Sequence, residues 1–239
     1  MTKIKNSISI IMPAYNEEEN IEEAITSSLE NLCKLTSNYE VIIVNDGSVD
    51  KTFERATNIS KNNPAVKVLS LVKNEGMGSA IRLGIKQAKS NLLFITCADN
   101  QFNIAELDKF LPPFLDMNVD NVDIVIGTRI NRKYTLFRKV NTRVYNFLIW
   151  LLFGVRFKDP SWVKLYKREV FDKISITSPG FFWDIETLIK AKREGFKIKE
   201  VDVSSYPRTR GVAHGSNPIK IVKTFFNMVH FWFQLKFHK

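Results

Sequence analysis

The sequence predicts an α/β fold in which helices flank a mostly parallel central sheet and a helical tail follows. Short apolar runs rich in β-branched residues alternate with amphipathic stretches of helical periodicity through the first hundred residues. This alternation is typical of a doubly wound sheet with right-handed crossovers. The chain has 239 residues, of which 44% are hydrophobic, enough for a sizeable core, and this argues against a disordered protein.

Four strands are expected in the first hundred residues, and each ends in polar or turn-forming residues. The first run breaks at Pro13, and the second stops at Asn45-Asp46-Gly47. We interpret these runs as central parallel strands. They lie at residues 7–15 (SISIIMPAY), 39–48 (YEVIIVNDGS), 65–72 (AVKVLSLV) and 91–99 (NLLFITCAD).

Helices are expected between these strands. Asn16 is positioned to cap the first, with an acid three residues on, and apolar residues then recur at helical spacing over residues 21–32. Ser48 is expected to cap the second, which runs to about residue 60. The third, at residues 78–90, opens with a Gly-rich turn. That turn could bring backbone N–H groups near a phosphate, or it could be a plain strand-to-helix connection.

The second half of the chain has a mixed pattern. A helix is expected at residues 104–115, ended by Pro112-Pro113, and a strand at 122–130 carries Arg129 just beyond its end. A further helix is expected within residues 181–198. Its first turn contains Asp184, an acid that suits the helix dipole.

The tail is expected to be an amphipathic helix with Asn217 as cap and Pro218 at its first position. Its aromatic face, flanked by lysines, suits an anionic lipid surface. Packing on the chain's own domain or on a partner chain would explain the pattern equally well. The apolar face comprises Ile219, Val222, Phe225, Phe226, Val229, Trp232, Phe233 and Phe237.

Composition limits the partners. The chain carries 35 Lys and Arg against 25 Asp and Glu, a net charge of +10 that favours an anionic partner. The basic residues are scattered and no nucleic-acid motif is present, which argues against RNA or DNA. Cys33 and Cys97 indicate neither a disulfide framework nor a zinc site. No signal peptide is expected, and the apolar segment 144–157 is too short and too polar to span a bilayer.

The polar strand ends are expected to meet. In sheets of this kind ligands bind beyond the carboxyl ends of the strands, and each strand of the first half ends in a polar cluster. These clusters are residues 13–17, 45–48, 73–76 and 99–101. Loop chemistry alone could account for any one of them. Tyr15, Glu17, Asp46 and Asp99 together indicate a binding cleft.

The chain resembles the inverting GT-A glycosyltransferases of family 2, in particular their dolichyl-phosphate mannosyltransferase and polyprenyl-phosphate glycosyltransferase branch. The resemblance extends from residue 7 to about 217, and the order and spacing of its motifs make it specific. The matching stretches are PAYNEEENI, VNDGSVDKT, KNEGMGSAIRLG, ADNQ, GTR, DPSWVKLYKREV, FFWDIETLIKAKREGFKIKEV and YPRTRG…HGS.

The resemblance implies a nucleotide-sugar donor, with GDP or UDP as the nucleotide, and a divalent cation, Mg²⁺ or Mn²⁺. The family's Asp-Ala-Asp-Gly-Gln stands here as Cys97-Ala98-Asp99-Asn100-Gln101, so the metal ligands would be Asp99 and Gln101. Because the first acid is a cysteine, we expect weaker metal binding than is usual in the family. The implied donor-binding residues are Pro13, Tyr15, Glu17, Val44, Asp46, Ala98, Asp99 and Gln101.

The resemblance further implies a polyprenyl-phosphate acceptor near Arg129. A phosphate acceptor needs no strong base, whereas Asp184 would serve as base for a hydroxyl acceptor. Arg208 and Arg210 lie in a loop expected to close over the donor. The implied catalytic set is Asp99, Arg129, Asp184, Arg208 and Arg210. The pattern at Trp162-Val163-Lys164 departs from the family's, which leaves the acceptor contacts there open.

The implied organisation is a transferase domain at residues 1–218 and the tail helix at 219–239. The first domain would divide into a nucleotide-binding half, 1–100, and an acceptor half, 101–218. The protein would be cytoplasmic and peripheral on the inner face of the membrane. Two alternatives stay open: a catalytically altered or inactive relative that acts by binding, and a transferase to a glycan hydroxyl.

Overall fold

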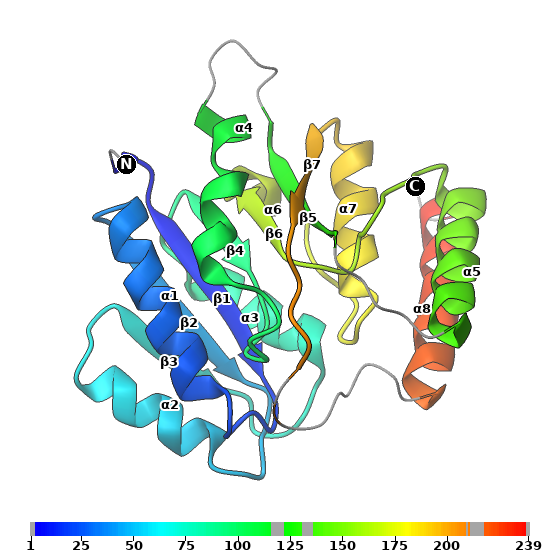
Figure 1. Ribbon diagram of the computed structural model, residues 1–239. Coiled ribbons are helices and arrows are strands. Elements are labelled where there is room, and N and C mark those ends of the chain that lie inside the picture. Colours follow the sequence, from blue (N-terminus) through cyan, green and yellow to red (C-terminus); the bar gives the residue numbers. More distant parts are fainter. Residues whose placement is uncertain (1–2, 116–121, 131–135, 209, 211–217, 238–239) are drawn as a thin grey trace.

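The computed structural model describes residues 3–115, 122–130, 136–208, 210 and 218–237 (Figure 1). A seven-stranded sheet of order β3-β2-β1-β4-β6-β5-β7 forms its centre. The strands are β1 (Ile8–Ala14), β2 (Tyr39–Asn45), β3 (Val66–Ser70), β4 (Leu92–Ile95), β5 (Ile124–Arg129), β6 (Lys164–Lys167) and β7 (Ile198–Val203). The helices are α1 (Ile21–Leu35), α2 (Thr52–Lys61), α3 (Met77–Gln87), the 3₁₀ helix η1 (Ile104–Phe110), α4 (Pro112–Leu115), α5 (Leu136–Phe153), α6 (Glu169–Lys173), α7 (Trp183–Arg193) and α8 (Pro218–Phe237).

The expected mostly parallel sheet is confirmed, with one reversed strand. β6 runs antiparallel to both of its neighbours, β4 and β5, and the other pairs are parallel. Because β6 is reversed, its first residue, Lys164, lies opposite Ile95 of β4 and Ile126 of β5. The amino end of β6 therefore lies at the same edge of the sheet as the carboxyl ends of its neighbours.

The strands are apolar on both faces because helices cover both. Ile10 packs toward α1, α2 and η1, whereas the next residue, Ile11, packs toward α3, α6 and α7. Ile43 and Ile42 divide in the same way between the two cores. Successive side chains of a strand point to opposite faces, so a strand buried on both sides is a continuous apolar run.

Two expected helix caps are wrong. α1 begins at Ile21 with Asn20 as its N-cap, and Asn16 instead has a positive φ of 54°. The side chain of Asn16 accepts the Val49 N–H at 3.0 Å, and Ser48 Oγ accepts the Asn16 N–H at 3.0 Å. The two residues therefore bind the β1–α1 and β2–α2 loops to each other. Their cap-forming chemistry is used between loops that are distant in sequence.

The position of α4 also corrects the sequence analysis. Pro112 and Pro113 were expected to end a helix, but the 3₁₀ helix η1 ends at Phe110 and α4 begins at Pro112. Proline is compatible with the first turn of a helix, because the N–H that it lacks has no partner within the helix at that position.

A third core lies under α5 and α8, which run side by side at one edge of the molecule (Figure 1). Ile149 of α5, Ile185 of α7 and Phe231 of α8 are buried together in it. Asn217, the expected cap of α8, lies outside the described residues. In the part of the chain that the structure describes, no helix has the length and apolarity that a bilayer span requires.

Candidate active site

Asp46 follows the carboxyl end of β2, and its carboxylate closes a neighbouring turn. Oδ1 accepts the N–H groups of Glu75 (2.8 Å) and Gly76 (3.2 Å), and Oδ2 accepts that of Gly76 at 3.0 Å. These residues precede α3. A backbone-bound carboxylate is held in one orientation, which is what reading a nucleotide base would require. That role for Asp46 stays a prediction.

The other expected base contacts surround the ends of β1 and β2. Pro13 and Val44 are partners in the parallel register of these strands, and both are buried. Tyr15 is half-buried in the loop that follows β1. The structure thus brings these three residues to the same sheet edge as Asp46.

The Gly-rich turn before α3 is a structural connection. Pro179 O accepts the N–H groups of Gly78 (2.8 Å) and Ser79 (3.2 Å) at the start of the helix. A Cβ on Gly78 would lie 2.1 Å from Ser178 O, so the two segments pack without room for a side chain. Of the two interpretations of this turn, the structure therefore supports the plain connection.

An ion pair between Glu17 and Arg208 links the loop after β1 to the segment after β7. Arg208 Nη2 donates to Glu17 Oε2 at 2.6 Å, and Asn20 Nδ2 donates to the same oxygen at 2.8 Å. Burial raises the pKa of the Glu17 carboxyl, although both donors favour its charged form. Arg210 lies further out, where it is exposed and 3.8 Å from Glu23 Oε2. The rest of the expected arginine loop, residues 209 and 211–217, lies outside the described residues.

Asp99 lies just beyond β4, where its Oδ1 accepts the Gln101 N–H at 3.2 Å. Burial raises the pKa of Asp99, and the N–H of Gln101 and the charges of Arg208 and Arg129 lower it. Gln101 also pairs with Tyr206: Tyr206 N–H donates to Gln101 O at 2.9 Å. Ala98 is fully buried beside them. The β4 tip therefore lies against the segment that follows β7.

Cys97 differs chemically from the acid that stands at this position in the family. Burial raises the pKa of its thiol well above the usual value, and the nearby charges of Asp99, Asp184 and Glu17 act in the same direction. The thiol is therefore protonated at neutral pH and is a poor ligand for Mg²⁺. The described residues form no cluster of three or more His, Cys, Asp and Glu side chains able to hold a metal ion.

Arg129 is held by Asp159. Its Nε donates to Asp159 Oδ2 at 2.7 Å and its Nη2 to Oδ1 at 2.9 Å, a bidentate pair. The Trp162 ring lies under the guanidinium, with its centroid 4.2 Å from Cζ. Two neighbours in the segment before β6 therefore fix the orientation of Arg129.

Asp184 opens the first turn of α7 and forms a buried ion pair with Lys164 Nζ. Burial raises the pKa of Asp184 to about 6, the Lys164 charge lowers it, and the charge of Asp159 raises it. The carboxyl is therefore mostly ionised at neutral pH.

Three residues of this site were not among the expected site residues. Asp159, Trp162 and Lys164 all come from the stretch DPSWVKLYKREV, and all contact either Arg129 or Asp184. The departure from the family pattern at Trp162 and Lys164 was visible in the sequence. Their partners were not, because Arg129 and Asp184 lie 20 or more residues away along the chain.

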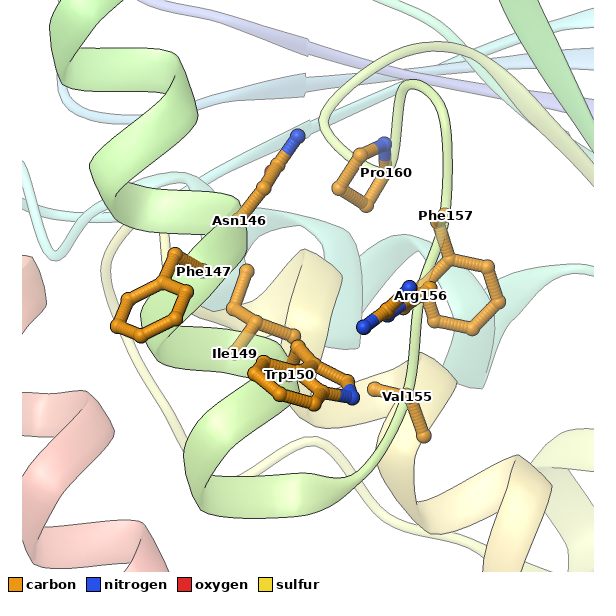
Figure 2. A pocket seen from close by; sticks show the side chains of 8 residues that line it. All are labelled: Asn146, Phe147, Ile149, Trp150, Val155, Arg156, Phe157 and Pro160. Atoms are coloured by element: carbon orange, nitrogen blue, oxygen red, sulfur yellow. The ribbon is translucent and has the colours of Figure 1, made fainter.

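A pocket of about 290 Å³ opens beside this site (Figure 2). Its walls come from α5 and from the segment that leads to Pro160, the neighbour of Asp159. Arg156 lies over the Trp150 ring at 4.5 Å from the centroid. The lining residues are Asn146, Phe147, Ile149, Trp150, Val155, Arg156, Phe157 and Pro160. The pocket is thus mostly aromatic and aliphatic, with one cation.

The family assignment follows from a sequence profile. The profile of glycosyl transferase family 2 matches residues 9–186, which include the tips of β1, β2, β4 and β5. The chain belongs to glycosyltransferase family 2. It is therefore a glycosyltransferase, and its fold is that of the GT-A enzymes.

Named relatives are about 30% identical. The dolichol-phosphate mannosyltransferase of Pyrococcus furiosus is 31% identical over 215 residues, which cover 85% of this chain and 58% of that protein. The dolichyl-phosphate beta-glucosyltransferase of Drosophila melanogaster is 31% identical, with 82% of this chain and 66% of that protein covered. The chain thus spans less than two thirds of either of these two relatives.

Solved structures of similar fold include glucosyl-3-phosphoglycerate synthase from Mycobacterium tuberculosis. In complex with phosphoglyceric acid it has a TM-score of 0.74 and 19% identity, covering 95% of this chain and 80% of that one. A second crystal structure of it contains Mn²⁺, UDP and phosphoglyceric acid. Its TM-score is 0.71 at 21% identity, with 94% and 78% of the two chains covered.

Proposed function

We propose that this protein transfers a sugar, with inversion, from a nucleoside-diphosphate donor to a polyprenyl phosphate. The acceptor phosphate oxygen attacks the anomeric carbon, a bond forms between them, and the bond from that carbon to the diphosphate breaks on the opposite face. Relatives named for dolichyl-phosphate acceptors support the acceptor class. A solved neighbour with bound UDP supports the donor class.

The donor would lie across the tips of β1, β2 and β4. Asp46 would accept from the base, with Pro13, Tyr15 and Val44 beside it. Arg208, held by Glu17 and close enough to influence Asp99, would neutralise charge that develops on the leaving diphosphate. Arg210 would act from the outer side of the same segment.

The β4 tip suits a divalent cation, because the Asp99 carboxylate and the Gln101 side-chain carbonyl are the hard oxygen donors that Mg²⁺ and Mn²⁺ prefer. Such an ion needs only one or two protein oxygens when diphosphate and water complete its shell. The ion would supply positive charge at the leaving group. Mn²⁺ in a solved neighbour supports its use.

One observation carries the choice of acceptor: the residue next to the partner of Arg129 lines an apolar pocket. The bidentate partner of Arg129 is Asp159, and the next residue, Pro160, lines the pocket of Figure 2. An aromatic and aliphatic cavity lined by the cation Arg156, with Arg129 linked to it through Asp159 and Pro160, suits a phosphate that carries a hydrocarbon chain. A small hydrophilic acceptor would gain nothing from these walls.

The state of Asp184 supports an anionic acceptor. Its carboxylate is bound to the Lys164 ammonium, so accepting a proton would break this ion pair, although burial raises its pKa to about 6. A phosphate acceptor is already a nucleophile and needs no proton removed, whereas a hydroxyl acceptor does. The roles of Asp184 and of the arginines named here belong to the proposal.

The edge formed by α5 and α8 would rest on the membrane surface. Trp150 and Leu151 of α5 and Phe226 and Phe237 of α8 are large exposed side chains, although other residues of both helices are buried in the third core. Exposed aromatic side chains next to lysines are typical of helices at an anionic lipid surface. Through this edge the protein would bind the inner face of the membrane from the cytoplasm.

The test is a transfer assay with the purified full chain, undecaprenyl phosphate in detergent, and GDP-mannose, UDP-glucose or UDP-GlcNAc, each with and without Mn²⁺. We expect one donor to give a glycosylated lipid phosphate of the calculated mass, faster with Mn²⁺. Donor binding in the absence of any transfer, measured by thermal shift, would contradict the proposal and identify a silent relative of the family.

A further inference from the structure

Lys164 is a fully buried lysine at the functional edge of the sheet. It is the first residue of β6, and the reversed direction of that strand delivers it beside the ends of β4 and β5. An ionised lysine is rarely buried unless it is paired. Because its side chain is shielded from solvent, it is not placed to touch a substrate.

The ammonium group of Lys164 joins two segments. It donates to Asp184 in the first turn of α7, and to Trp162 O at 2.8 Å. It also lies 5.4 Å from the centroid of the Trp183 ring. One cation thus binds the start of α7 to the backbone of the segment that precedes β6.

That segment carries the support of Arg129. The side chain of Trp162 packs against the guanidinium, and Asp159 binds the guanidinium through two hydrogen bonds. The carbonyl of Trp162, held by Lys164, is part of the same residue as the ring that supports Arg129. A shift of this carbonyl would change the angle of the ring, and with it the direction of Arg129.

We infer that Lys164 is a positioning residue for the acceptor phosphate: through Trp162 it sets the direction of Arg129 and fixes Arg129 relative to Asp184. The inference rests on the proposed function in one respect, that Arg129 binds the acceptor phosphate. It assigns a task to two of the three residues that depart from the family pattern. A purely structural ion pair would stabilise the fold but leave Arg129 unaffected.

The experiment compares Lys164→Met and Trp162→Leu with wild type. Lys167→Met is the matched control, since Lys167 is also on β6 and pairs with an acid, Asp123, at 3.1 Å. The first readout is hydrogen exchange of the Arg129 Nε–H, followed by ¹⁵N NMR and assigned by its loss in Arg129→Lys. The second is the KM for undecaprenyl phosphate beside the Kd for the donor nucleotide.

We expect both variants to exchange the Arg129 Nε–H at least tenfold faster than wild type and to raise the acceptor KM at least tenfold. The nucleotide Kd should stay within about twofold, and Trp162→Phe should recover part of the loss because it keeps an aromatic ring. Lys167→Met should behave as wild type in both readouts.

A folded Lys164→Met with wild-type exchange and acceptor KM, and only a lower Tm, would overturn the inference. If that variant does not fold, the double variant Lys164→Met/Asp184→Asn, which removes both charges of the pair together, decides by the exchange of the Arg129 Nε–H. If wild type glycosylates no lipid phosphate, the proposed function fails. The exchange of the Arg129 Nε–H still decides whether Lys164 and Trp162 position Arg129.

Discussion

Asp99 is the acid on which metal-dependent transfer depends in this account. Asp99→Asn should lower turnover by roughly 100-fold or more, because a neutral amide cannot replace a carboxylate on a hard cation and several kcal/mol of charge stabilisation are lost. The Mn²⁺-dependent part of donor binding, measured by calorimetry, should disappear with it. Asp108→Asn, in η1, is the matched control. Wild-type turnover in Asp99→Asn would refute the metal assignment.

Asp184 should make stability depend on pH. Its folded pKa, about 6, is raised above the usual 3.8. The stability that this shift contributes is therefore fully present below about pH 4 and is lost as pH rises through 6. Between pH 5 and 7 the loss should be about 1 kcal/mol. The charged groups that influence Asp184 are Lys164, Asp159 and Arg129.

Urea unfolding at pH 5 and pH 7 measures this difference. Wild type should lose more stability over the interval than a Lys164→Met/Asp184→Asn double variant, which removes both charges together. Equal pH dependence of the two proteins would show that another group titrates there.

At this scale, the positions of single residues in the fold could be predicted where the chemistry is local. Asp99 and Gln101 could be placed at a strand tip because they follow an apolar run directly. The roles of Lys164 and Asp159 could not be predicted, because the role of a charged side chain depends on which residue it pairs with. The partners of these two, Asp184 and Arg129, are brought close only by the reversed strand β6 and by α7.

Among the elements, the contact between α3 and the segment before α7 stabilises the arrangement of the candidate site. Glu186 accepts the Thr177 N–H and the Ser178 N–H, each at 2.7 Å, and Pro179 O receives the N–H groups at the start of α3. Asp46 holds the residues before that helix. These hydrogen bonds connect the end of β2 to α7, whose first turn carries Asp184.

Gly78→Ala should break this contact. Its new Cβ would meet Ser178 O at 2.1 Å, and relieving that clash should cost about 1–3 kcal/mol of the free energy of unfolding. Gly180→Ala is the control, because nothing lies within 4 Å of a Cβ at that position. Chemical denaturation of both variants checks the prediction, which fails if the two are equally stable.

Helices and strands could be predicted where they depend on local sequence, and not where they depend on contacts between distant segments. Apolar periodicity located the strands of the first half and their helices. The caps at Asn16 and Ser48 were wrong because these side chains bind a neighbouring loop in place of their own helix. The reversed direction of β6 could not be predicted. This strand has only four residues, Lys164–Lys167, and so short a stretch carries no pattern that distinguishes a parallel from an antiparallel neighbour.

For the whole molecule, the proposal assigns membrane contact to the edge formed by α5 and α8. The sequence left two interpretations of the tail open, a helix at a membrane surface or a helix packed on protein, and α8 has features of both. Met228 and Phe231 are buried in the third core, while Phe226 and Phe237 are more than 60% exposed. The division into residues 1–218 and 219–239 stays a prediction.

Replacing both exposed side chains, Phe226→Ser with Phe237→Ser, should lower the affinity for anionic vesicles by about tenfold or more, because buried apolar area at the interface is lost. Nucleotide affinity should not change. The control pair is Val49→Ser with Phe53→Ser, which are also exposed but lie in the nucleotide half. Co-sedimentation with phosphatidylglycerol vesicles gives the result, and equal binding of all three proteins would contradict membrane contact through α8.

The central claim is that the acceptor is a phosphate on a hydrocarbon chain. It is tested most directly by offering the full chain undecaprenyl phosphate, undecaprenol and 3-phosphoglycerate in competition, with the active donor and Mn²⁺, and identifying the products by mass spectrometry and anomeric NMR. We predict glycosylation of undecaprenyl phosphate almost alone, with the anomeric configuration inverted. Preferred glycosylation of undecaprenol or of 3-phosphoglycerate, or retention of configuration, would contradict the account.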